Sequence, residues 1–165
     1  MDIQRILKHL LMTEWQVKQA FSRDTLAAIG NAIKASETRH LGEIRFAVEG
    51  ALHSSGLFKG QSPRERAIEV FSHLHIWDTE HNNGVLIYLL LADRAVEIIA
   101  DRGVHVKVGS QQWNTICRTM EQAFRQAKYQ EGVVSGIDAV AQHLAKHFPG
   151  RGSKRNELPD APVVL

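Results

Sequence analysis

The chain has 165 residues, of which 44% are hydrophobic and 23% charged, and its formal net charge is +2 at pH 7. This length and composition predict one globular domain, and basic residues scattered among acidic neighbours exclude a nucleic-acid-binding surface. The single cysteine, Cys117, excludes an intramolecular disulfide and a cysteine-based zinc site.

The N-terminal residues 1–21 predict an amphipathic helix, because Ile3, Ile6, Leu7 and Leu10 recur at helical spacing. We expect its apolar face to pack on the protein's own domain, with docking on a membrane surface as the alternative. Charged residues within this segment argue against a signal peptide. The longest apolar run, at 85–92, is eight residues, whereas a membrane-spanning helix needs roughly 20. The expected location is the cytoplasm, with peripheral attachment to the inner membrane as an option.

The next segments alternate between helical and strand patterns. Ser22 or Asp24 caps a helix that ends at Gly42, and the alternating sequence "EIRFAVE" at 43–49 predicts a strand with one more polar face. "SPRE" at 62–65 is a capping box that opens the following helix. The run at 85–91 is apolar at every position, which is typical of a strand buried on both faces.

The remaining segments complete a layered fold. "RAVEIIAD" predicts a third strand, antiparallel because the corner before it is too short for a parallel crossover. Residues 104–108 are expected to form a fourth strand, and two helices follow before a mobile tail at 149–165. We therefore predict a three-layer α/β/α domain over 22–148, with a small mixed sheet of three to four strands and helices on both faces.

Polar residues gather at both ends of the predicted central strand. Asp93 and Arg94 follow it, and Glu49 ends the parallel first strand, so these three share the carboxyl edge, where α/β sheets usually bind ligands. Asp93 and Glu49 are the predicted ligands of Ca²⁺ or Mg²⁺, since hard cations prefer oxygen, and Arg94 is the predicted phosphate-binding residue. The alternative ligands at the opposite edge are Asp78, Glu80 and Asp101. Ordinary turn chemistry is the competing interpretation at both edges.

The stretch "NNGVLIYLLLADRAVEIIADRG" resembles the TPM domain family. The matching positions are Asn83, Gly84, Asp93, Arg94 and Gly103. A later pattern of Tyr129, Gly132, Gly136 and Ala139 resembles the final helices of the family, so the likeness extends over 22–148. The family includes a thylakoid-lumen repair protein, a nematode receptor modulator and many bacterial envelope-associated proteins. The resemblance implies an α/β/α fold, calcium binding and a weak phosphatase activity proposed for some members.

From these observations we expect a bacterial TPM-like binding module without enzymatic activity. It would act with an unidentified protein partner near a membrane surface, with an optional divalent cation at Asp93. The alternative function is a weak metal-dependent phosphomonoesterase, in which Asp93 and a neighbouring carboxylate hold the metal and Arg94 holds the phosphate.

Overall fold

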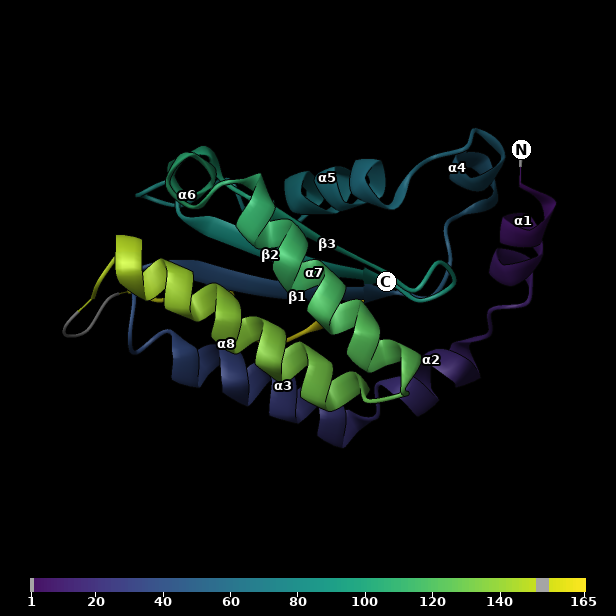
Figure 1. The fold of residues 1–165 in the computed structure, drawn as a ribbon, viewed down its shortest axis with the longest axis horizontal. Coiled ribbons are helices and arrows are strands. Elements are labelled where there is room, and N and C mark those ends of the chain that lie inside the picture. The colour runs from purple at the N-terminus through teal and green to yellow at the C-terminus, as the bar shows by residue number, and fades with distance from the viewer. Residues whose placement is uncertain (1, 151–154) are drawn as a thin grey trace.

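A computed structural model describes residues 2–150 and 155–165 of the chain (Figure 1). Within these residues the central sheet has four strands in the order β3-β2-β1-β4. The strands are β1 (Glu43–Glu49), β2 (Gly84–Leu90), β3 (Ala95–Ala100) and β4 (Val163–Val164).

The strand pairing agrees with the sequence. β1 and β2 are parallel, from Glu43 opposite Gly84 to Glu49 opposite Leu90. β3 returns antiparallel to β2 after a tight corner. Arg94 takes a left-handed conformation there, with φ of 51°, and its N–H donates to the Leu91 carbonyl at 3.0 Å. The predicted crossover and the predicted antiparallel return are both confirmed.

Helices cover both faces of this sheet, so the predicted three-layer α/β/α architecture is confirmed (Figure 1). One face carries α3 (Arg23–Ser36), α7 (Ser110–Arg125) and α8 (Tyr129–His147), and the other carries α4 (Ser54–Phe58) and α5 (Pro63–His73). β2 is buried along its whole length. Its residues alternate between the two cores, so that Ile87 packs with the α3, α7 and α8 layer and Leu86 with the α5 layer.

The N-terminal segment forms two short helices instead of one. α1 (Ile3–Leu10) begins at the N-cap Asp2, and α2 (Glu14–Ala20) begins at Thr13, whose side chain and Gln16 form a capping box. This capping box competes with continuation of α1 and ends the predicted single helix. Among the described residues, no helix combines the length and the apolar content that crossing a bilayer requires.

The prediction of a strand at 104–108 is wrong, because this segment lies in α6 (Arg102–Val108). The valines at 104, 106 and 108 alternate as in a strand, yet Val104 is fully buried while Val106 is 78% exposed. The Asp101 carboxylate accepts the Arg102 N–H at 2.7 Å and starts a helix directly after β3. Local capping therefore overrides the β propensity of the valines.

The fourth strand comes from the C-terminal segment, which we had predicted to be mobile. Residues 155–165 lie against β1, and β4 pairs with it in parallel, Ala47 opposite Val163. The Glu43 carboxylate accepts the Leu158 N–H at 3.3 Å, and the Arg45 guanidinium donates to the carbonyls of Pro159 and Ala161. The rest of the predicted tail includes 151–154, which lie outside the described residues. The C-terminal segment thus supplies the partners of Glu43 and Arg45 on the polar face of β1.

Gly84 offers a direct test of this packing. A Cβ at Gly84 would lie 2.2 Å from the Ile76 carbonyl oxygen, whereas one at Gly30 would meet its nearest neighbour, a Pro162 carbon, at 3.4 Å. We expect Gly84→Ala to lower the free energy of unfolding by about 1–3 kcal/mol, because backbone must move. The control Gly30→Ala should change it by less than about 1 kcal/mol. Urea unfolding measures the free energy of unfolding of both variants, provided that its dependence on urea concentration is unchanged. Equal unfolding midpoints for the two variants would contradict this packing at Gly84.

Candidate functional site

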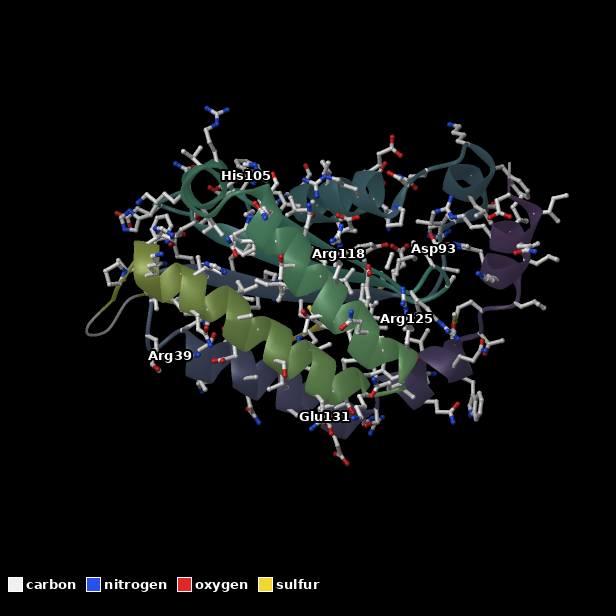
Figure 2. All side chains as sticks on the ribbon, in the orientation of Figure 1. Arg39, Asp93, His105, Arg118, Arg125 and Glu131 are labelled. Carbon is white, nitrogen blue, oxygen red and sulfur yellow. The ribbon has the colours of Figure 1, made fainter. Side chains whose placement is uncertain are left out.

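The two predicted groups of polar residues lie at opposite ends of the sheet, as expected from the strand pairing. Figure 2 shows Asp93 at the end nearest α1, whereas His105 of α6 lies toward the other end. At that other end, Asp78 and Glu80 line an open cleft of about 400 Å³ beside Glu157, while Asp101 lines a different cleft of about 630 Å³ beside Trp77. The alternative metal ligands therefore do not share one cleft.

Three residues of the matching sequence pattern lie at this end and have packing roles: Asn83, Gly84 and Gly103. Asn83 is fully buried, and its amide donates to the Leu41 carbonyl at 2.8 Å. A Cβ at Gly103 would lie 2.6 Å from the Asn82 carbonyl oxygen, so only glycine allows α6 to approach the 81–82 loop this closely. This part of the sequence pattern therefore contributes to the fold.

At the carboxyl end, Asp93 binds two side chains of α1. The Arg5 Nε lies 3.1 Å and 3.0 Å from its two oxygens, the Arg5 Nη2 lies 2.9 Å from Oδ2, and the His9 Nε2 lies 3.0 Å from Oδ1. Burial raises the pKa of Asp93, but the hydrogen bonds from Arg5 and His9, together with the charge of Arg5, outweigh it and hold the pKa below the usual value of 3.8. Asp93 is therefore a carboxylate at neutral pH.

The His9 ring is oriented by both of its nitrogens. Its side chain is fully buried, and its Nδ1 accepts the Leu52 N–H at 3.0 Å. Since an accepting Nδ1 carries no proton, the hydrogen on Nε2 is the one donated to Asp93. His9 thus links the corner after β2 to the loop after β1.

Glu49 is held by a second, separate set of partners. Its carboxylate is almost completely buried and accepts from the Tyr88 hydroxyl at 2.6 Å and from the Arg66 guanidinium at 2.9 Å and 3.1 Å. The hydrogen bonds to Glu49 raise the pKa of Arg66, and burial followed by the bond to Glu49 raises the pKa of Tyr88. The carboxylate is therefore neutralised by a cation from α5.

Neither predicted metal ligand fits a divalent cation in this arrangement, because both carboxylates already bind positively charged side chains. Among the residues that the structure describes, no group of three His, Cys, Asp or Glu side chains is placed to hold a metal ion. Arg94, the predicted phosphate-binding residue, is exposed and lines another cleft with Gln16 of α2 and Tyr129 of α8. The structure thus brings Asp93 to α1 instead of to Arg94 or Glu49.

The orientation of α1 corrects one sequence prediction. The helix turns Arg5 and His9 toward the domain, and its apolar side chains point to solvent: Ile3 is 70% exposed, Leu7 51% and Leu10 62%. Only Ile6 of this apolar set is partly buried, against the α5 side of the core. The expectation that the apolar face packs on the domain is therefore wrong. Arg5 and His9 were not identified as site residues, although their spacing of four, opposite the leucines, was a readable signal.

Comparison with known proteins relates most of the chain to one domain family. The sequence profile of the TPM domain matches residues 16–143. A search of curated proteins finds no match. Among solved structures, the BA42 protein from the psychrophilic bacterium Bizionia argentinensis is similar at 30% identity, with a TM-score of 0.76 over 87% of this chain and 94% of that one. An N-terminal domain of a protein from P. gingivalis shares the fold at 21% identity, with a TM-score of 0.62 over 79% of this chain and 82% of that one.

The hydrogen bond from Tyr88 to Glu49 predicts that losing the Tyr88 hydroxyl lowers the stability of the fold. Tyr88→Phe removes a donor to a buried carboxylate, so we expect the free energy of unfolding to fall by about 1–3 kcal/mol. Tyr129→Phe is the matched control, because it keeps the ring that stacks on Phe124, and it should cost less than about 1 kcal/mol. Urea unfolding compares them, and a Tyr88→Phe variant as stable as the control would rule out the hydroxyl as a stabilising donor.

The lowered pKa of Asp93 predicts how stability depends on pH. A carboxyl group with a lower pKa in the folded state than in the unfolded state stabilises the protein at pH values above its unfolded-state pKa. This stabilisation is lost as the pH falls through the folded-state pKa. We therefore expect Asp93→Asn to be less stable than the wild type at about pH 7, with the difference shrinking toward zero near about pH 2. Urea unfolding across this range measures the difference. A difference that stays constant down to the lowest pH would show that the carboxylate charge is irrelevant.

Proposed function

Because the chain belongs to the TPM domain family, we propose that it acts as a binding module that attaches to a membrane surface through α1. The observation that carries the proposal is the exposed apolar side of this helix, made of Ile3, Leu7, Leu10 and the following Leu11. Four large apolar side chains within nine positions form a continuous stripe that the domain itself leaves uncovered.

Neighbouring elements carry further exposed aromatic side chains. Trp15 of α2 is 68% exposed and Phe58 of α4 is 55% exposed. α4 contacts α1, and Figure 1 shows α1, α2 and α4 together at one end of the molecule. Amphipathic helices with flanking aromatic side chains bind in the plane of a lipid interface, with the apolar face in the acyl region.

The charges around the stripe favour an anionic lipid surface as the occupant. Lys8 and Lys59 are exposed on α1 and beside α4. The positive charges of Arg5 and Lys18 are paired with Asp93 and Glu14. Exposed lysines near a membrane are attracted to acidic headgroups, and this attraction weakens as salt rises. The docked arrangement already directs the apolar stripe outward, so the domain need not rearrange before attachment.

A phosphomonoesterase reaction is the alternative function and stays a prediction. It requires Asp93 to hold a metal ion and Arg94 to hold phosphate, whereas Asp93 binds Arg5 and His9. Turnover of a generic phosphate ester with Mg²⁺, Ca²⁺ or Mn²⁺, abolished in a folded Asp93→Asn variant, would favour this alternative.

Membrane attachment is tested by co-sedimentation with vesicles of phosphatidylethanolamine and phosphatidylglycerol. The double variant Leu7→Glu, Leu10→Glu should bind at least about tenfold more weakly, because burying each leucine stabilises the bound state by roughly 1.5–3 kcal/mol. Val106→Glu is the control, since Val106 is 78% exposed on α6 at the other end of the sheet, and it should bind like the wild type. A wild-type protein that stays in the supernatant would contradict the proposal.

A further inference from the structure

We propose that α1 supplies a built-in counter-ion, the Arg5 guanidinium, to the carboxyl edge of the sheet, so that a docked α1 and a metal ion at Asp93 exclude each other. Arg5 and His9 occupy the positions around Asp93 that a cation would need. Asp93 then acts as a positioning residue, because it holds α1 with its apolar side outward. The inference does not depend on membrane attachment.

The first argument is the number of contacts at the carboxylate. A carboxylate offers about four lone-pair sites, and Arg5 and His9 make four contacts of 2.9–3.1 Å with Asp93. The side chain of Asp93 is only 12% exposed, so little of it faces solvent. A Ca²⁺ ion takes six to eight oxygen ligands at about 2.3–2.6 Å and could approach only where the guanidinium and the imidazole lie.

A backbone carbonyl oxygen that shares Arg5 with Asp93 is also occupied by α1. The Arg5 Nη2 donates to the Gln61 carbonyl at 2.7 Å while it contacts Asp93. Two carboxylate oxygens and a carbonyl oxygen are the ligand types that a hard cation would use. Here they are bridged by one planar guanidinium, which matches a carboxylate with two parallel hydrogen bonds.

The second argument is that α1 has few other attachments. Its apolar stripe is exposed, and Ile6 is its single partly buried apolar residue within the described helix. The polar contacts of Arg5 and His9 with Asp93, Gln61 and Leu52 therefore account for most of its docking. Asp93 takes part in the larger share of these contacts, so removing its charge should release the helix.

The experiment uses the full chain without lipid and follows amide hydrogen exchange by NMR. In Asp93→Asn and in Arg5→Ala, the amides of α1 should exchange at least about tenfold faster, as expected when a charged hydrogen-bonded pair is broken. Amides of β2 should keep their wild-type rates, which separates release of α1 from general destabilisation. Asp138→Asn is the matched control, because it breaks an exposed ion pair with Arg39 and should leave α1 unchanged. If Asp93→Asn does not fold, Arg5→Ala decides the result.

Titration of the wild type with Ca²⁺ alone tests the exclusion. Amide resonances of Asp93 and Leu52 that do not shift would support the proposal. Resonances that shift together with faster amide exchange throughout α1 would also support it. Shifted amides at Asp93 with α1 still protected would overturn it, since metal and helix would then coexist. Unchanged α1 exchange in both Arg5→Ala and Asp93→Asn would overturn the role of Asp93.

Discussion

The structure depends on burying two parallel strands on both faces. Every residue of β1 and β2 is buried, so the sheet needs a helical layer on each side. β2 meets this requirement with apolar side chains and with Tyr88, whose hydroxyl donates to Glu49. β1 does not, because it carries Glu43, Arg45 and Glu49 into the same interior. A buried charge is costly unless it is paired and hydrogen-bonded.

The partners of these charges come from distant parts of the chain. The C-terminal segment supplies backbone N–H groups to Glu43 and carbonyls to Arg45, and α5 supplies Arg66 to Glu49. At the corner after β2, α1 supplies Arg5 and His9 to Asp93. Each polar group at the sheet thus fixes one peripheral element, which explains how a tail and a short N-terminal helix become parts of the domain.

This arrangement changes the meaning of the acidic residues at the carboxyl edge. In sequence they suggest a cation site, because α/β sheets bind ligands there and hard cations prefer carboxylates. In the structure the positive charge is contributed by the protein itself. Docking α1 by its polar side leaves leucines and an isoleucine exposed on the opposite side of the helix. The same docking that neutralises Asp93 therefore creates the surface that we propose for membrane attachment.

The sequence by itself determined the layered fold, the parallel β1–β2 pair, the antiparallel return and the separation of the polar residues into two edges. These follow from local periodicity, capping and the length of the corner at Asp93, all of which act within a few residues of each other. Only the tertiary structure decided that β4 comes from the C-terminal segment and that α1 docks by Arg5 and His9. These outcomes depend on partners more than 80 positions apart, such as the Arg5 guanidinium with the Asp93 carboxylate and the Arg45 guanidinium with the Pro159 carbonyl. The local sequence pattern holds no information about such pairs. The free energy that stabilises them arises only when the distant segments meet in the folded protein.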